Sequence, residues 1–256
     1  MRYVKIAGHA ISVIGLGTWQ IGTPSWGWGT EFGPSDIETI LDTAQKVGIN
    51  LIDTAELYGN GESELQLGLH LAKIDKRFLV ASKISPWNLG SRGVQKAASR
   101  SLQRLQVARI DFYQIHTPNP FIPLSKTMAG MKLLLDENKI HAVGVSNFSL
   151  KRWKQAEKIL GHRIWTNQVN YSLLHSRAFN SLKPMLDEDH TLIAYSPLAM
   201  GLLSGKYSST HRPSDSRSKN PKFSNRNFSK VRPMLQTLEK LAKKHDAVVS
   251  QIALAW

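Results

Sequence analysis

Four side chains that can exchange or stabilise a proton stand at or just beyond the ends of short apolar runs. Asp53 ends the run INLID, Lys83 ends FLVASK and His116 ends IDFYQIH. Tyr58 follows Asp53 by five residues, in a polar loop that contains glycine. A carboxylate, a phenol, an ammonium group and an imidazole are together typical of proton transfer, provided that the fold brings them to one place.

These four groups have complementary chemistry. A free phenol has a pKa of about 10 and donates its proton poorly at neutral pH. An adjacent ammonium group favours the phenolate and lowers that pKa, and a carboxylate that pairs with the ammonium group holds it in position. We therefore expect Tyr58 to protonate an oxygen that gains negative charge, with Lys83 and Asp53 activating the phenol. His116 is expected to orient the same oxygen through a hydrogen bond.

Each residue also has an ordinary structural explanation. An aspartate at a strand end is most often a cap or turn residue, and a loop tyrosine is usually a surface aromatic. His116 precedes TPNP and fits a turn histidine. Lys83 is harder to explain in this way, because burial of an ammonium group without a partner is costly. The occurrence of all these groups at consecutive strand ends favours the functional interpretation.

The elements that position these residues are recurring apolar runs, each followed by an amphipathic stretch. Such alternation predicts parallel βαβ units. Lys83 follows Asp53 by 30 residues and His116 follows Lys83 by 33, a regular period of one unit. This period favours an α/β fold with a closed (β/α)8 TIM-type barrel, in which the carboxyl ends of the strands share one face. The seven predicted strands span 13–18, 49–54, 77–83, 110–116, 140–147, 165–170 and 191–196.

Other segments add detail to this fold. The opening YVKIAGHAISVIG alternates around Gly8 and predicts an N-terminal β-hairpin. Ser35 with Glu38 predicts a capping box for the first helix, and Ser149 predicts the cap of a later one. A closed barrel needs an eighth strand, whereas the sequence after Tyr195 holds a basic loop and helical stretches. We therefore expect one domain over residues 1–256, truncated at the C-terminus and lacking the eighth strand and helix.

Composition narrows the class of protein. The absence of cysteine excludes disulfides, thiol nucleophiles and thiolate metal sites. No run of about 20 apolar residues and no signal-peptide pattern is found, so we expect a cytoplasmic protein without membrane attachment. The net charge is +14, and much of the excess lies between Lys206 and Arg232 in a Ser/Asn/Pro-rich segment. A basic surface can bind nucleic acid, but this segment has neither aromatic interleaving nor helical spacing, so we expect no such partner.

The sequence lacks the motifs of several other kinds of functional site. Among the histidines only His116 ends a strand, and no H-x-H or H-E-x-x-H pair occurs, so we expect no metal. The nucleophile elbow G-x-S-x-G is also absent. The run GLGTWQ has Gln20 where a dinucleotide fingerprint needs its third glycine, which disfavours a Rossmann fold. Proton donation combined with hydride transfer remains, and this chemistry requires a cofactor.

The later strand ends offer groups that suit a nicotinamide carboxamide. Ser146, Asn147 and Gln168 carry hydroxyl or amide groups that donate and accept hydrogen bonds. Tyr195 offers a flat ring, and SPLAMGLLSGK supplies small residues and backbone N–H groups suited to a pyrophosphate. Each of these residues also fits a polar strand end that faces solvent. Together they favour a dinucleotide laid across the mouth of the barrel.

The order and spacing of the motifs resemble the aldo-keto reductases. The likeness runs through IGLGTWQIG, LIDTAELYGNGESE, LVASK, LQRLQVARIDFYQIHTPNP, KIHAVGVSNFS, NQVNYSLL, AYSPLAMGLLSGKY and VSQIALAW, and it covers essentially the whole chain. The resemblance implies a barrel that reduces aldehydes or ketones with NADPH, and NADH is not excluded. It places the family's catalytic tetrad on Asp53, Tyr58, Lys83 and His116.

The resemblance also implies the binding residues. Nicotinamide contacts fall on Thr18, Trp19, Asp53, Ser146, Asn147, Gln168 and Tyr195, and the segment that covers the pyrophosphate falls on Ser196, Pro197, Leu198 and Lys206. In the family, the adenosine 2′-phosphate is held by a segment beyond IALAW, so the preference for NADP over NAD rests on analogy. An apolar cup for a small carbonyl substrate is expected from Trp19, Trp26, Trp28 and Trp87, next to His116.

Two other functions remain open at this stage. The first is an NADPH-binding regulatory subunit similar to the β-subunits of voltage-gated potassium channels, which share the barrel. In those proteins the tetrad histidine is replaced, so His116 favours an enzyme. The second is an inactive truncated reductase. The physiological substrate and the oligomeric state do not follow from the sequence.

Overall fold

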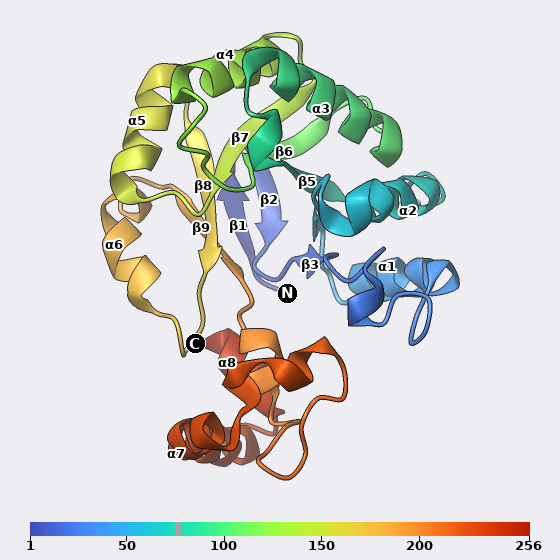
Figure 1. The fold of residues 1–256 in the computed structure, drawn as a ribbon, viewed down its shortest axis with the longest axis vertical. Helices are drawn as coiled ribbons and strands as arrows, with labels where there is room; N and C mark the ends of the chain where they lie inside the picture. Colours follow the sequence, from blue (N-terminus) through green and yellow to red (C-terminus); the bar gives the residue numbers. More distant parts are fainter. Residues whose placement is uncertain (75–77) are drawn as a thin grey trace. The chain divides into compact units, whose positions relative to one another are not determined.

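The computed structural model describes residues 1–74 and 78–256, and the chain divides into two compact units (Figure 1). Unit 1 comprises Met1–Gln168 and Pro184–Leu192, and unit 2 comprises Val169–Lys183 and Ile193–Trp256. None of the helices in the described residues is both long enough and apolar enough to cross a membrane.

One seven-stranded sheet forms the centre of the fold, and its strands follow one another in chain order. The neighbouring strands from β3 to β8 pair in parallel. This arrangement confirms the predicted α/β class with consecutive parallel units. The strands are β3 (Leu16–Gly17), β4 (Leu51–Asp53), β5 (Leu79–Ile84), β6 (Ile110–Ile115), β7 (Ile140–Ser146), β8 (Ile164–Asn170) and β9 (Thr191–Tyr195).

All seven predicted strands are present, and each differs from its predicted bounds by one or more residues. The strand expected over 13–18 is reduced to the two residues of β3. The strand expected from residue 77 begins at Leu79 as β5, and residue 77 lies outside the described residues. Every residue of β5 and β6 is buried, as expected for parallel strands that are covered on both faces.

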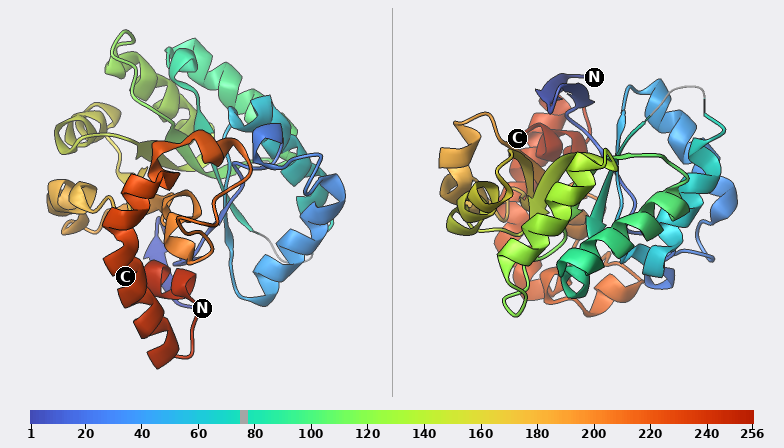
Figure 2. Two further views of the ribbon diagram at one scale, coloured as in Figure 1. Left: turned by 60° about the horizontal axis from the view of Figure 1, so that its bottom comes forward. Right: turned by 90° about the horizontal axis from the view of Figure 1, so that it is seen from above.

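Helices cover the outer face of the sheet in unit 1 (Figure 2). Each helix follows a strand, and consecutive helices from α1 to α5 pack against one another. They are α1 (Ile37–Lys46), α2 (Glu62–Leu71), α3 (Ser91–Leu105), α4 (Leu124–Asp136) and α5 (Leu150–Leu160). Short 3₁₀ turns precede or connect these elements at Pro24–Trp26 (η1), Pro34–Asp36 (η2), Tyr58–Gly61 (η3) and Pro86–Asn88 (η4).

The two predicted helix caps have different outcomes. Ser149 caps α5 by accepting a hydrogen bond from the Arg152 N–H at 3.3 Å, and the helix ends at Gly161 in the left-handed region, φ 69°. The capping box of Ser35 with Glu38 is wrong. Pro34 begins the turn η2 ahead of α1, and the side chain of Asp36 accepts the Gly33 N–H at 2.7 Å. Proline at the first position of a turn sets φ, so the chain turns before Ser35 can act as a cap.

The predicted N-terminal hairpin is confirmed. Strands β1 (Tyr3–Ile6) and β2 (His9–Ser12) pair antiparallel around Ala7 and Gly8, which both have positive φ. Ile6 and Ile11 pack in one buried cluster with Leu51 and Leu79, the first residues of β4 and β5. The hairpin therefore covers the amino ends of the strands and leaves their carboxyl ends for other residues.

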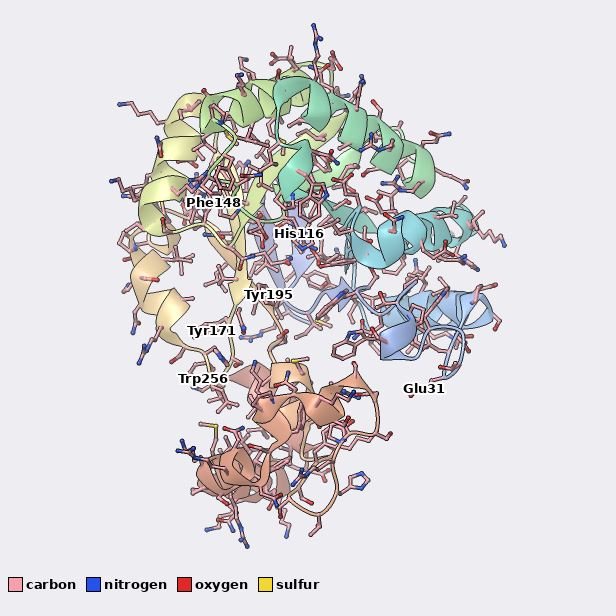
Figure 3. The ribbon with its side chains drawn as sticks, viewed as in Figure 1. Glu31, His116, Phe148, Tyr171, Tyr195 and Trp256 are labelled. Atoms are coloured by element: carbon pink, nitrogen blue, oxygen red, sulfur yellow. The ribbon has the colours of Figure 1, made fainter. Side chains whose placement is uncertain are left out.

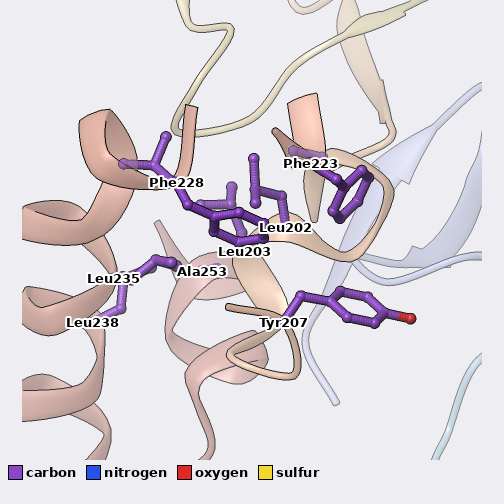
Figure 4. Packing of buried hydrophobic residues seen from close by; sticks show 10 residues of the cluster. Leu202, Leu203, Tyr207, Phe223, Phe228, Leu235, Leu238 and Ala253 are labelled. Carbon is purple, nitrogen blue, oxygen red and sulfur yellow. The ribbon is translucent and has the colours of Figure 1, made fainter. Parts of the chain in front are cut away.

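Unit 2 has its own apolar core (Figure 4). Leu202, Leu203, Phe223, Phe228 and Leu235 are buried together in it. The basic segment between Lys206 and Arg232, expected as a loop, contains the buried aromatics Tyr207, Phe223 and Phe228, and a long helix begins within it at Asn225. The elements are α6 (Arg177–Leu186, which begins in this unit), η5 (Ala199–Ser204), η6 (Ser216–Lys219), η7 (Pro221–Phe223), α7 (Asn225–Lys244) and α8 (Val249–Ala255).

Candidate active site

Three of the four predicted catalytic side chains meet at the ammonium group of Lys83. Its Nζ lies 2.6 Å from Asp53 Oδ2, 3.0 Å from the Tyr58 hydroxyl and 2.9 Å from the Thr54 carbonyl oxygen. An ammonium group has three hydrogens to donate, and each has one of these acceptors. The lysine side chain is fully buried, 0% exposed, so this hydrogen bonding compensates for its removal from water.

Strand pairing and a tight turn bring these groups together. Asp53 ends β4 opposite Ala81, and Lys83 projects on the same side of β5 two residues later. Tyr58 returns over the lysine on a turn in which its N–H donates to the Ala55 carbonyl at 3.1 Å. Gly59 follows with φ 56°, and a Cβ there would lie 2.7 Å from the backbone of Gly22. Only glycine fits at that position, so the loop that carries the phenol depends on this close approach.

Two glutamines complete the surroundings of Asp53. Its second oxygen, Oδ1, accepts hydrogen bonds from Gln168 Nε2 at 2.8 Å and from Gln114 Nε2 at 3.3 Å. Sequence reasoning assigned Gln168 to the cofactor and did not identify Gln114. Strand periodicity was the available signal, because Gln114 stands two residues before His116 and therefore points to the same face of β6.

The pKa of Lys83 lies above its ordinary value of 10.5. Burial is the largest influence and acts to lower this pKa, but the charges and hydrogen bonds of Asp53 and Tyr58 together raise it by more. Lys83 is therefore an ammonium ion throughout the neutral range. At hydrogen-bond distance such a cation favours the phenolate form of a tyrosine.

His116 contacts Tyr58 edge to face, with ring centroids 5.6 Å apart and planes at 81°. His116 is half-buried, and Figure 3 labels it among the side chains of unit 1. The pKa of His116 is lowered to about 4, first by burial and then by the positive charge of Lys83. Its ring is neutral at pH 7, and Nδ1 is buried without a hydrogen-bond partner among the described residues. A neutral imidazole beside the phenol can donate one hydrogen bond but is a poor source of protons.

Three of the cofactor residues predicted in unit 1 form a connected group at the carboxyl ends of β7 and β8. The Gln168 carbonyl accepts from Ser146 Oγ and from the Asn147 N–H, both at 2.9 Å. Asn147 has φ 61°, exposes its side chain and donates from Nδ2 to Ser146 Oγ at 3.1 Å. Thr18 binds the Asp53 carbonyl through both its N–H and its hydroxyl, at 3.0 Å each.

The predicted aromatic cup is only partly assembled within unit 1. Trp19, which is 46% exposed, packs against Trp26 at 5.2 Å between ring centroids. Trp28 instead packs edge to face against Phe32 at 5.4 Å. Trp87 lies in η4 after β5 and is 69% exposed. The structure thus pairs two of the four tryptophans.

The remaining predicted cofactor residues belong to unit 2. Tyr195 ends β9 with an exposed ring, and Ser196 follows with φ 52°. Pro197 and Leu198 lead into η5, and the exposed Lys206 places its ammonium group 5.7 Å from the ring centroid of Tyr207.

The residues present suit a nicotinamide dinucleotide. Left-handed backbone at Ser196, Ala199 and Met200 gives concave turns of the kind that bind anions through N–H groups. The exposed amide of Asn147 can donate to and accept from a carboxamide. Within unit 1 the exposed ring of Trp19 offers a flat apolar face, and within unit 2 the exposed ring of Tyr195 offers another.

Other features of the described residues do not define a competing site. A surface hollow of about 600 Å³ beside the end of α5 is lined by Glu157, Arg163 and His190 among others, and it shares no residue with the Lys83 group. Within residues 1–74 and 78–256 no three His, Asp or Glu side chains are grouped so that they could hold a metal ion.

Comparisons with known proteins identify relatives of this chain. A family model described as "Aldo/keto reductase family" matches residues 13–256. An uncharacterized oxidoreductase of Mycobacterium tuberculosis is 43% identical over 100% of this chain and 80% of its own length. The NADH-specific methylglyoxal reductase of Escherichia coli is 31% identical over 96% of this chain and 82% of its own.

A solved structure supports the fold. The crystal structure of an aldo/keto reductase from Klebsiella pneumoniae in complex with NADP and acetate matches with a TM-score of 0.76 and 28% identity. The match covers 100% of this chain and 80% of that one. The strand and helix order described above is therefore that of a known reductase fold.

Proposed function

Because the chain belongs to the aldo/keto reductase family and is an NAD(P)H-dependent oxidoreductase, we propose that it reduces an aldehyde or ketone to an alcohol with Tyr58 as the proton donor. The observation that carries this proposal is the 3.0 Å hydrogen bond between Lys83 Nζ and the Tyr58 hydroxyl. It is the contact that a tyrosine needs in order to act as an acid at neutral pH.

Bound NADPH, or NADH, supplies a hydride to the carbonyl carbon. The residues proposed to hold the cofactor are Thr18, Trp19, Ser146, Asn147, Gln168, Tyr195, Ser196, Pro197, Leu198 and Lys206. The related protein of Klebsiella pneumoniae was crystallised with NADP and the relative of Escherichia coli is named for NADH, so both cofactors are retained.

Tyr58 donates its proton to the carbonyl oxygen as that oxygen gains negative charge. Lys83 stabilises the phenolate that remains, because its ammonium group is fixed at hydrogen-bond distance before the reaction begins. Asp53 holds the ammonium group through Oδ2 at 2.6 Å. The position of the phenol and the charge beside it therefore need no rearrangement during proton transfer.

His116 orients the substrate oxygen. With a pKa of about 4 its ring is neutral at pH 7, so it donates a hydrogen bond without supplying the proton. This division of roles leaves Tyr58 as the acid. Trp19, Trp26, Trp28 and Trp87 are proposed to provide the apolar contacts of the substrate.

The proposal extends to the rest of the molecule. We propose a single barrel domain over residues 1–256, located in the cytoplasm and acting on small carbonyl compounds. Neither a metal nor a nucleic acid takes part. NADP is the cofactor favoured by analogy.

The test is oxidation of NADPH and of NADH by the purified chain, with a panel of small aldehydes and ketones. Thermal denaturation with added cofactor provides a second readout, since a ligand at 100 times its Kd stabilises the native state by about 2.7 kcal/mol. Turnover together with a higher melting temperature supports the proposal. A melting shift without turnover of any carbonyl compound would favour a regulatory NADPH-binding protein instead.

A further inference from the structure

Glu56 lies between Asp53 and Tyr58 in the chain and is nearly buried, at 8% exposure. Beyond the end of β4 the backbone continues to pair with β5. The Thr54 N–H donates to the Ala81 carbonyl at 2.8 Å, and the Glu56 N–H donates to the Lys83 carbonyl at 3.2 Å. The next donor along this segment is the N–H of Ser85, just after β5, and it binds the Glu56 side chain, with 2.6 Å between N and Oε1.

The Glu56 carboxylate thus takes the place of a backbone acceptor. The main chain leaves the sheet after Glu56, because the turn from Ala55 to Tyr58 carries the phenol back toward Lys83. Ser85 is buried, at 1% exposure, so its N–H would lose its partner where the main chain departs. An unpaired N–H in that position is costly, and the side chain of Glu56 removes this cost.

Two further contacts tie the same carboxylate to the segment after β5. Asn88 in η4 donates from Nδ2 to Oε1 at 3.0 Å, and Arg100 on α3 lies with Nη2 3.5 Å from Oε2. The carboxylate therefore joins the start of the Tyr58 turn to both η4 and α3. The pKa of the buried Tyr113 lies above its ordinary value, first because of burial and then because of the charge of Glu56.

We propose that Glu56 is a positioning residue for the proton donor. By accepting the Ser85 N–H and the Asn88 amide, Glu56 fixes the Ala55–Tyr58 turn against the end of β5. It thereby holds the Tyr58 hydroxyl at hydrogen-bond distance from Lys83. This inference rests on the proposed function for its effect on turnover, whereas the geometry it describes is measurable without turnover.

Two conservative variants separate the geometry from the charge. Glu56→Gln keeps an acceptor oxygen of the same reach and loses the charge, and we expect its kcat to stay within about threefold of the wild type. Glu56→Asp keeps the charge and is one methylene shorter. We expect its kcat to fall about 10- to 100-fold with little change in KM, because small displacements of a catalytic group cost this much.

A spectroscopic titration measures the contact itself. The difference in phenolate absorbance between each protein and its Tyr58→Phe derivative reports the ionisation of Tyr58 alone. We expect Glu56→Asp to move this ionisation to higher pH, because the phenol lies farther from the Lys83 ammonium group, and Glu56→Gln to leave it close to that of the wild type.

Glu157→Ala is the matched control. Glu157 also accepts a backbone N–H, that of Ile164, with 2.8 Å between N and Oε2, and it lies outside the proposed site. We expect this variant to melt at a lower temperature with unchanged kcat and unchanged Tyr58 titration. A purely structural role for Glu56 would give the same result in Glu56→Asp and would overturn the inference.

A larger loss of kcat in Glu56→Gln than in Glu56→Asp would also overturn it, because the charge rather than the acceptor position would then matter. Absence of carbonyl reduction by the wild type would refute the proposed function instead. In that case the Tyr58 titration still decides whether Glu56 positions the phenol.

Discussion

Replacement of Asp53 by asparagine should leave the buried ammonium group of Lys83 without its counter-ion. The chain provides a matched control in Asp42 and Lys46, since both ion pairs measure 2.6 Å between nitrogen and oxygen. The side chains of Asp53 and Lys83 are 17% and 0% exposed, whereas those of Asp42 and Lys46 are 54% and 73% exposed. The same substitution in the two pairs therefore differs mainly in burial.

The expected cost follows from that difference. Breaking a buried pair by removing one partner costs about 3–5 kcal/mol, and an exposed pair contributes about 0–1 kcal/mol. We expect Asp53→Asn to lower the free energy of unfolding by about 3 kcal/mol, at the lower end because Tyr58 and the Thr54 carbonyl still accept from the lysine. Asp42→Asn should cost less than about 1 kcal/mol.

The pH dependence supplies a second signature. In the wild type the pKa of Lys83 is raised above its ordinary 10.5, so its contribution to stability is present below that pH and is lost only at higher pH. In Asp53→Asn the negative charge that opposes the effect of burial is lost, so burial lowers the pKa of Lys83. Between the lowered pKa and 10.5 the unfolded chain then binds more protons than the native one. The stability of the variant should therefore rise with pH where that of the wild type stays flat with respect to this group.

Thermal denaturation of the wild type and both variants, from about pH 6 to about pH 9, measures both effects. Steady-state kinetics should show a fall in kcat of at least about 100-fold for Asp53→Asn, because the phenol loses a fixed cation beside it. If Asp53→Asn melts like Asp42→Asn and turns over like the wild type, the Asp53–Lys83 pair has neither role and this reasoning is wrong.

Three further outcomes follow from the same geometry. Tyr58→Phe should reduce kcat by about 10²- to 10⁴-fold and keep the melting shift caused by NADPH, and undiminished carbonyl reduction would refute Tyr58 as the acid. His116 has a folded pKa of about 4 against an ordinary 6.5, so the unfolded chain binds the extra proton between these values. Stability should fall by up to about 3 kcal/mol as the pH drops through this window, and urea unfolding of His116→Asn should lack that fall. Gly144→Ala would place a Cβ 2.3 Å from Thr166 Oγ1, so it should lower the melting temperature, with partial rescue by Thr166→Ala.

The strands and their polar ends were predictable from sequence because the relevant physics is local. Apolar runs of about six residues between amphipathic stretches indicate buried parallel strands. Their carboxyl ends share one face, which is enough to place Asp53, Lys83 and His116 together. Gln114 could have been found by the same periodicity.

The other outcomes depend on conformations that residue types do not encode. Ser35 has the composition of a cap, but Pro34 starts a turn ahead of it. The acceptor role of Glu56 exists only because the chain turns at Ala55, and a glutamate in a polar loop gives no sign of it. Glu64 is similar, since it is buried against Arg104 on α3, 40 residues away. Such contacts follow from tertiary structure alone.

The hydrogen bonds around Asp53 indicate which hydrogen atoms of the site stay in place during the reaction and which one is transferred. One oxygen faces the ammonium group and the other faces two amide groups, so Gln114 and Gln168 give the carboxylate only hydrogens that stay in place. Lys83 keeps its own three. If the phenol is the acid, it is the single exchangeable position that empties in each cycle, and water must refill it. Reaction rates in mixtures of light and heavy water should then vary linearly with the deuterium fraction, which indicates that a single solvent-derived proton is transferred.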